Sequence, residues 1–107
     1  MSRIKCQERQ HIVYELTVEG CKYIGTTNVE EQLGIEGSLA RRVAKHWYRL
    51  KDTKRNEWTL YKAIKRACSS KHDIERTVLA VCANKAEAHS VETQLIAQRK
   101  PALNSDV

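Results

Sequence analysis

The stretch 11–25 constrains the fold most, because two short runs of β-forming residues flank the pair Glu19-Gly20. Such a Gly-containing pair predicts a β-hairpin with a two-residue turn. In that register Tyr14 lies opposite Gly25, whereas a three-residue turn would break the register. Every second residue of the hairpin then shares one sheet face: Tyr14, Leu16, Val18, Cys21, Tyr23 and Gly25.

The middle of the chain predicts a loop followed by a cationic helix. The segment from Thr26 to Gly37 contains two glycines and a short acidic stretch, which indicates an enlarged loop. A helix should follow from Leu39 to about Leu50, capped by Ser38. Its apolar residues repeat every four positions, and the side opposite them is basic: Arg42, Lys45, His46 and Arg49.

The C-terminal half predicts a second helix, a strand and a last helix. The second helix spans Glu57–Cys68 and directs three cations outward: Lys62, Lys65 and Arg66. The strand spans Ile74–Ala83 and is apolar enough for a central strand buried on both faces. Asn84 and Glu87 have the spacing of an N-cap and its partner for a helix that ends near Arg99. The order β-β-α-α-β-α predicts an α+β fold with a small, mainly antiparallel three-stranded sheet flanked by helices.

Length and charge limit what this fold can do. A chain of 107 residues has room for one domain, expected at 11–107 after a polar extension at 1–10. The formal charge of +6 favours a polyanionic partner, first of all nucleic acid. We find no apolar run of membrane-spanning length and no signal peptide, so we expect a cytoplasmic protein. The four cysteines stand singly, which predicts free thiols in a reducing compartment.

Glu92 is anomalous on the last predicted helix. Its neighbours on the helical wheel form an apolar arc that should be buried: Ala88, Val91, Leu95 and Ile96. A carboxylate inside such an arc is costly unless it is paired, protonated or bound to a cation. One interpretation is a glutamate at the edge of the arc that reaches water or pairs with an arginine. The other is a carboxylate that binds a metal ion or acts as an acid or base.

Taken together, the motifs resemble those of the GIY-YIG nucleases. Ile12-Val13-Tyr14 and Tyr23-Ile24-Gly25 match the two-part signature, and the segment 60–65 resembles the family's second helix. Single residues match further family positions in order: Arg42, His46, Glu92 and Asn104. The resemblance covers residues 11–104. It implies a small GIY-YIG-like nuclease domain that hydrolyses DNA phosphodiester bonds with one Mg²⁺ or Mn²⁺ ion.

The resemblance also implies a role for each matched residue. Glu92 would hold the single divalent ion, since Mg²⁺ seldom needs a cage made only of protein ligands. The two signature tyrosines would position or deprotonate the attacking water, and Arg42 would clamp the scissile phosphate. His46 would assist with charge or proton transfer, and Asn104 would orient the site by hydrogen bonds.

Two departures from the family pattern leave alternatives open. Ile12 stands where the family usually has Gly, and the enlarged 26–37 loop makes Arg41 a rival for the role of Arg42. We prefer Arg42 because it precedes His46 by four residues and so shares its helix face. Each matched residue also has a structural interpretation: sheet packing for the tyrosines, a solvated helix face for the Arg42–His46 pair and a turn for the asparagine.

The sequence therefore predicts a metal-dependent DNA endonuclease with little base readout. Five basic residues on the two central helices would contact phosphates: Lys45, Arg49, Lys62, Lys65 and Arg66. Specificity would come from the shape of the DNA, the 26–37 loop, a second copy of the chain in a homodimer or an accessory protein. The main alternative is an inactive module of the same fold that binds nucleic acid or protein. Binding or cleavage of RNA is a further alternative.

Overall fold

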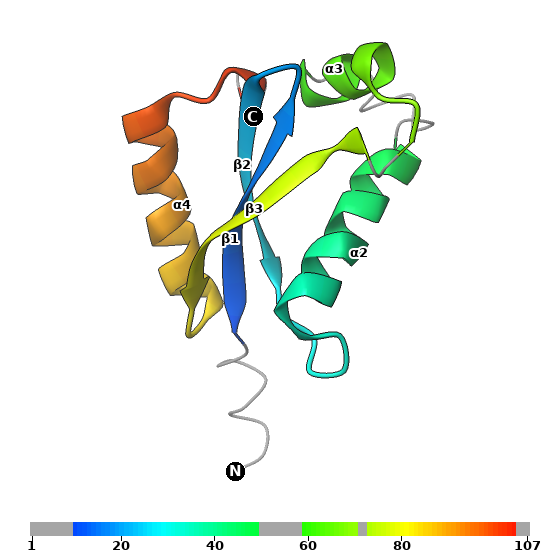
Figure 1. The fold of residues 1–107 in the computed structure, drawn as a ribbon. Helices are drawn as coiled ribbons and strands as arrows, with labels where there is room; N and C mark the ends of the chain where they lie inside the picture. Colours follow the sequence, from blue (N-terminus) through cyan, green and yellow to red (C-terminus); the bar gives the residue numbers. More distant parts are fainter. Residues whose placement is uncertain (1–9, 50–58, 71–72, 105–107) are drawn as a thin grey trace.

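The computed structural model describes residues 10–49, 59–70 and 73–104, which form an α+β fold (Figure 1). Its elements are β1 (His11–Val18), β2 (Cys21–Asn28), α2 (Gly34–Tyr48), α3 (Thr59–Ala67), β3 (Glu75–Cys82), α4 (Lys85–Arg99) and the short 3-10 helix η3 (Ala102–Asn104). Within these residues the strands form a three-stranded antiparallel sheet in the order β2-β1-β3. The predicted fold class and element order are confirmed.

The hairpin has the predicted two-residue turn. Glu19 and Gly20 have φ angles of 53° and 79°, and a type I′ turn requires positive φ at both of its central residues. The register follows from this turn, with Tyr14 paired with Gly25. Because side chains alternate along a strand, Tyr14 and Tyr23 lie on the same face of the sheet, as predicted.

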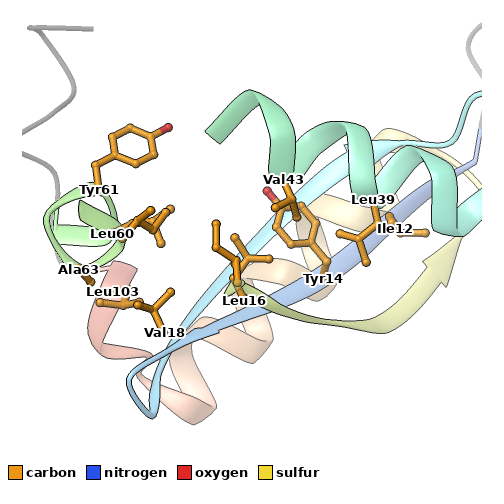
Figure 2. Packing of buried hydrophobic residues seen from close by; sticks show 12 residues of the cluster. Ile12, Tyr14, Leu16, Val18, Leu39, Val43, Leu60, Tyr61, Ala63 and Leu103 are labelled. Carbon is orange, nitrogen blue, oxygen red and sulfur yellow. The ribbon is translucent and has the colours of Figure 1, made fainter. Parts of the chain in front are cut away.

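Helices cover both faces of the sheet, with α2 and α3 on one side and α4 on the other (Figure 1). Figure 2 shows how alternate residues of β1 pack against α2, α3 and η3. The buried aliphatic members of this first cluster include Ile12, Leu16, Val18, Leu39, Val43, Leu60, Ile64 and Leu103. The second cluster packs under α4 and is smaller, with four buried members: Val13, Ile24, Cys82 and Ala88.

Helix α2 begins at Gly34, so the predicted start after a Ser38 cap was wrong. The expected loop 26–37 shrinks to the segment 29–33, because β2 continues further and the helix starts earlier. Gly34 has a φ angle of 71°, a conformation that Gly adopts at little cost, and this lets the chain turn abruptly into the helix. Ser38 lies inside the helix, where its hydroxyl accepts a hydrogen bond from the Glu30 N–H at 2.8 Å.

Strand β3 lies at an edge of the described sheet, so the prediction of a central strand was wrong. It pairs with β1 there, and Val81 is 48% exposed. The apolar run has another cause. Val78 packs with the first cluster and Leu79 with the second, so helices cover both faces of this edge strand.

The last helix matches its prediction at both ends. The Asn84 side chain accepts a hydrogen bond from the Glu87 N–H at 2.8 Å, and the Glu87 carboxylate accepts one from the Ala83 N–H at 2.7 Å. The helix ends at Arg99 and is followed by Lys100 in the left-handed conformation, with a φ angle of 46°. This capping satisfies backbone N–H groups at the start of α4 and fixes where the helix begins.

Parts of two helix predictions lie outside the described residues. Helix α2 is described to Tyr48 and α3 from Thr59, so the predicted end at Leu50 and start at Glu57 are not covered. No helix in the described ranges is long and apolar enough to cross a membrane. The cysteines within those ranges are free thiols, as predicted: Cys21, Cys68 and Cys82.

Candidate functional site

Two tyrosines of the hairpin form the base of the candidate site. Tyr14 on β1 and Tyr23 on β2 lie on the α2-facing side, with ring centroids 6.4 Å apart. Gly25 makes room for both rings. A Cβ at this position would lie 2.8 Å from Tyr14 Oη and 3.0 Å from Tyr23 Cε2. The close approach of the two rings therefore depends on a residue without a side chain.

The imidazole of His46 connects the hairpin to two helices. Its Nε2 lies 2.9 Å from Tyr14 Oη, and its Nδ1 lies 3.0 Å from the hydroxyl of Tyr61 on α3. All three side chains are buried, so the prediction that His46 lies on the basic side of its helix, opposite the apolar residues, was wrong. Burial, together with the charges of Arg42 and Arg49, lowers the pKa of His46 from 6.5 to about 3. The ring is therefore neutral at pH 7, with one nitrogen donating and the other accepting.

Of the two candidate arginines, Arg42 faces the tyrosines. Its Nε donates a long hydrogen bond to Tyr14 Oη at 3.4 Å. Arg41 instead forms an ion pair with Glu30 at the surface. Of the two arginines, Arg42 is therefore the one whose charge lies at the tyrosine pair.

Burial keeps both tyrosines protonated at neutral pH. Desolvation raises the pKa of Tyr14, a negative charge on Tyr23 would raise it further, and Arg42 opposes the increase. Desolvation also raises the pKa of Tyr23, again with Arg42 opposing. Tyr14 is 0% exposed, whereas Tyr23 is partly exposed. Tyr23 is therefore the member of the pair that solvent or a substrate can touch.

Glu92 lies on α4, which covers the other face of the sheet from α2 (Figure 1). The predicted arc of α4 faces the second cluster but is buried only at Ala88, while Val91, Leu95 and Ile96 are partly buried and pack against it. The side chain of Glu92 is 21% exposed beside this arc, and its carboxylate lies 3.4 Å from Nδ1 of His89. Desolvation is the largest cause of the raised pKa of Tyr23, and the negative charge of Glu92 adds a smaller contribution in the same direction.

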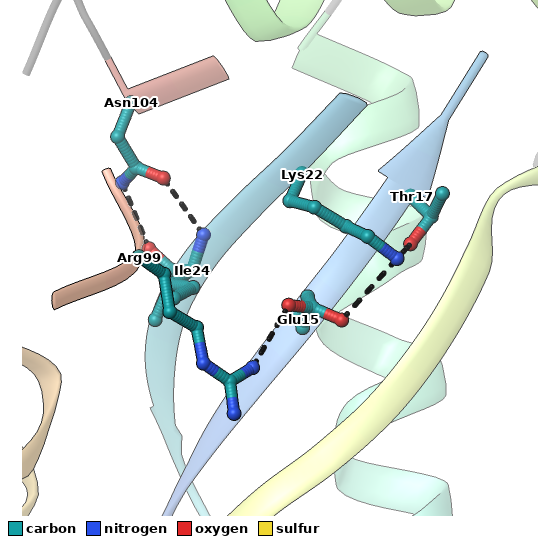
Figure 3. Close-up of polar contacts among 6 residues, drawn as sticks. All are labelled: Glu15, Thr17, Lys22, Ile24, Arg99 and Asn104. Carbon is teal, nitrogen blue, oxygen red and sulfur yellow. Dashed lines mark hydrogen bonds and ion pairs between the residues drawn. The ribbon is translucent and has the colours of Figure 1, made fainter. Parts of the chain in front are cut away.

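Asn104 holds the backbone of β2 next to Tyr23 (Figure 3). Its Oδ1 accepts a hydrogen bond from the Ile24 N–H at 2.8 Å, and its Nδ2 donates to the Ile24 carbonyl at 2.9 Å. The side chain thereby takes the place of a neighbouring strand at this edge of the sheet. Because Ile24 lies between Tyr23 and Gly25, Asn104 fixes the segment of β2 that carries the site.

The five predicted phosphate-contacting cations are divided between α2 and α3. Arg66 on α3 forms an exposed ion pair with Glu19 of the hairpin turn at 2.9 Å, which balances part of its charge. Lys62 and Lys65 are exposed on the same helix. The other two belong to the helix that carries the candidate arginine, since Lys45 lies on α2 and Arg49 is its C-cap residue. The α2 cations are thus the better placed to act with the tyrosine pair.

Tyr61 is the residue of this cluster that sequence reasoning missed. Its position in the apolar pattern of α3 predicts a core residue, and it is 0% exposed. Its hydroxyl was the available signal, because a buried tyrosine O–H usually finds a hydrogen-bond partner. That partner, His46, lies 15 residues earlier on another helix. The contact depends on tertiary packing and leaves no local pattern.

The described residues limit the number of side chains that could bind a metal ion together. Among them, no group of three or more His, Cys, Asp or Glu side chains could hold an ion. A single carboxylate still suits Mg²⁺, which commonly binds one or two carboxylates and completes its shell with water and phosphate oxygens. Glu92 offers a carboxylate of this kind, because its side chain is partly exposed.

Comparison with protein-family models, with curated proteins and with solved structures finds no match for this chain. The resemblance to the GIY-YIG nucleases therefore rests on the motifs of the sequence. The arrangement of Tyr14, Tyr23, Arg42 and Glu92 is accordingly the main evidence for the chemistry of the site.

Proposed function

We propose that this chain is a small endonuclease of the GIY-YIG type, which hydrolyses DNA phosphodiester bonds with one divalent metal ion. One observation carries the proposal. The Nε of Arg42 donates to Tyr14 Oη at 3.4 Å, and the ring of Tyr14 lies 6.4 Å from that of Tyr23, so a guanidinium and a partly exposed phenol lie together. Phosphodiester hydrolysis needs a positioned water and positive charge at the phosphate and the leaving oxygen. These residues would supply part of that chemistry.

The surroundings of each residue suggest its role. Arg42 would bind the scissile phosphate through the terminal nitrogens of its guanidinium, since its Nε is directed at Tyr14. Tyr23, the accessible tyrosine, would orient the attacking water by a hydrogen bond. His46 has too low a pKa to take a proton efficiently near pH 7, so it would act as a neutral partner that holds Tyr14 in place.

Glu92 would hold the Mg²⁺ or Mn²⁺ ion. When bound, such an ion supplies positive charge that activates a water and neutralises the phosphate. Because its pKa is raised, Tyr23 stays protonated at neutral pH and is not available as a base, which favours orientation of the water over its deprotonation. Asn104 would keep β2, and with it Tyr23, in register.

An inactive module of the same fold, which binds nucleic acid or protein, is the second candidate. Two observations favour it: Tyr14 has no accessible surface, and Glu92 already has a partner in His89. Such a module would bind DNA through its basic helices with a steep dependence on salt. It would leave the DNA intact.

A plasmid-nicking assay with Mg²⁺ or Mn²⁺ separates the two candidates. We expect the wild-type chain to nick supercoiled plasmid only when metal is added. Glu92→Gln should slow nicking by more than ~100-fold, since loss of contacts that merely support a metal ligand costs ~10–100-fold. Glu75→Gln, which removes an exposed carboxylate from β3, is the matched control and should nick normally.

Two results would count against the endonuclease proposal. Binding of plasmid without metal-dependent nicking would support the inactive module. Nicking that survives Glu92→Gln would remove this carboxylate from the site. Offering RNA in the same assay tests the nucleic acid, and metal-dependent cutting of RNA but not DNA would contradict the DNA assignment.

A further inference from the structure

A polar cleft lies beside the tyrosine pair, between the end of β2 and helix α2. Thr27 and Asn28 line it from the strand, and Arg41, Arg42 and Lys45 line it from the helix. Hydroxyl, amide, guanidinium and ammonium groups thus face one another across the cleft. This donor set suits an anionic oxygen ligand such as a phosphate.

Glu30 is the acidic residue of the same cleft, opposed by the three cations of α2. It forms an ion pair with Arg41, and its backbone N–H is held by the Ser38 hydroxyl. The carboxylate is therefore fixed where it competes with any incoming anion for Arg41. The cleft still has an excess of positive charge.

Among the residues that the structure describes, those lining the cleft are all polar and none is aromatic. Proteins that hold the bases of a single strand use aromatic side chains on which the bases stack. A cleft with donors and charges but no stacking platform fits the phosphate backbone instead.

The cleft and the tyrosine pair lie along one line of the sheet. Tyr23, Gly25 and Thr27 alternate onto the same face of β2, and the four-residue step from Tyr23 to Thr27 spans about 13 Å. Arg42 belongs to both places, because its Nε contacts Tyr14 while the residue also lines the cleft. A phosphate bound in the cleft would therefore be a different phosphate from one bound at Tyr23, but both would belong to the same nucleic-acid strand.

We propose that this cleft is a second phosphate subsite, which binds a backbone phosphate of the DNA a few nucleotides from the bond that is cut. Arg41 and Lys45 hold this phosphate, and Glu30 tunes its affinity by competing for Arg41. The proposal rests on the proposed nuclease function for the identity of the strand, but its binding contacts can be tested without cutting.

The test measures the affinity for a short DNA duplex as a function of salt, by fluorescence anisotropy without divalent metal. Lys45→Ala should reduce the slope of log K against log salt concentration by about 0.9, the value for one lost phosphate contact. Lys85→Ala removes an exposed lysine on α4, across the sheet, and should leave the slope unchanged. Equal effects of the two substitutions would overturn the subsite.

Glu30 provides a test in the opposite direction. Glu30→Gln should tighten binding and steepen the salt dependence, because it removes the competitor for Arg41. Glu36→Gln makes the same change of charge at an exposed position of α2 outside the cleft lining and should have a clearly smaller effect. If Glu30→Gln weakens binding or matches Glu36→Gln, the role given to Glu30 is wrong.

Neutral phosphate analogues locate the contact on the DNA. A duplex with one methylphosphonate linkage, moved along the strand, should bind the wild-type chain more weakly at one linkage near the cut. At that linkage the Arg41→Ala/Lys45→Ala variant should show no further loss. Equal sensitivity of both proteins at every linkage would overturn the subsite. Two further results would also overturn it: full competition for DNA binding by millimolar inorganic phosphate, and a loss of affinity in the cleft variants that appears only with an RNA duplex.

The outcomes also separate this subsite from the nuclease proposal. If the cleft variants bind DNA more weakly but no chain cuts DNA, the subsite stands and the nuclease function fails. If Glu92→Gln abolishes cutting while the cleft variants bind and cut normally, the nuclease function stands and the subsite fails.

Discussion

The two faces of the sheet differ in chemistry as well as in size. Under α2 and α3, the buried cluster contains the hydroxyls of Tyr14 and Tyr61 and the imidazole of His46 among its apolar residues. Under α4, the buried members are apolar side chains and one thiol: Val13, Ile24, Cys82 and Ala88. We call the side under α2 and α3 the polar face, because its core includes buried polar groups. The side under α4 is the apolar face, where the buried side chains only pack.

This difference explains why the candidate site lies at β2. The polar face bonds its buried groups internally, since no buried side-chain nitrogen or oxygen in the described ranges lacks a partner. Such networks fix geometry, but only while every member is satisfied. The apolar face fixes the position of α4, the helix that carries Glu92. Tyr23 faces one side of β2 and Ile24 the other, so this strand joins the two regions.

Replacement of Gly25 should have the largest effect, and it tests the polar face. In Gly25→Ala the new Cβ would lie within 3.0 Å of atoms of both Tyr14 and Tyr23, so the rings must move. Overpacking of this kind costs about 1–3 kcal/mol of unfolding free energy, and nicking should become undetectable because the rings define the site. Urea unfolding and the plasmid assay measure the two effects.

Gly20→Ala is the control for Gly25→Ala. Gly20 has open space around its Cβ position but a positive φ angle of 79°, so Ala costs about 1–2 kcal/mol through backbone strain alone. Nicking should persist once the protein is folded. If both variants lost stability and activity in parallel, Gly25 would matter for folding only, and the tyrosine geometry would carry no special role.

The pH dependence of stability should come from the polar face. His46 has its pKa lowered to about 3 in the folded chain, against 6.5 when unfolded. Below pH 6.5 the unfolded chain therefore binds more protons, so stability is full above pH 6.5 and falls as the pH drops toward 3. At pH 5 this single group should account for about 2 kcal/mol of lost stability.

Substitution of histidine on each face checks the source of this slope. Urea unfolding of His46→Gln between pH 7 and pH 4 should show a much flatter dependence, although the variant starts from a lower stability. His89→Gln, which changes an exposed residue of α4, should keep the wild-type slope. The reverse pattern would mean that the buried imidazole does not control acid stability.

Local features were predictable because their causes lie within a few residues. The turn at Glu19-Gly20 determines the hairpin register, and the Asn84 cap determines where α4 begins. The start of α2 was missed, because glycines are typical of loops and only the positive φ at Gly34 shows how the chain enters the helix. The edge position of β3 depends on which strands pair, and an apolar run does not reveal that.

The candidate site shows the same division. The helical spacing of Arg42 and His46 predicts a shared orientation, and both side chains do contact Tyr14. The burial of Tyr14 and the contact of Glu92 with His89 were not predicted, because they depend on how helices from two faces meet the sheet. For the same reason, a hydroxyl on α3 escaped notice.

That hydroxyl allows the finest test of the polar face. Tyr61→Phe removes the partner of His46 Nδ1 and keeps the ring that packs in the core. The unfolding free energy should fall by about 1 kcal/mol, the usual net value of one hydrogen bond. If Tyr61 positions His46, ¹⁵N NMR of the imidazole should also show a changed tautomer ratio, and nicking should slow with little change in DNA affinity.

Tyr48→Phe, which removes a hydroxyl from a side chain that is 61% exposed, is the control and should change neither the NMR spectrum nor the rate of nicking. An unchanged tautomer ratio in Tyr61→Phe would reduce Tyr61 to a packing residue and leave Tyr14 as the partner that orients His46.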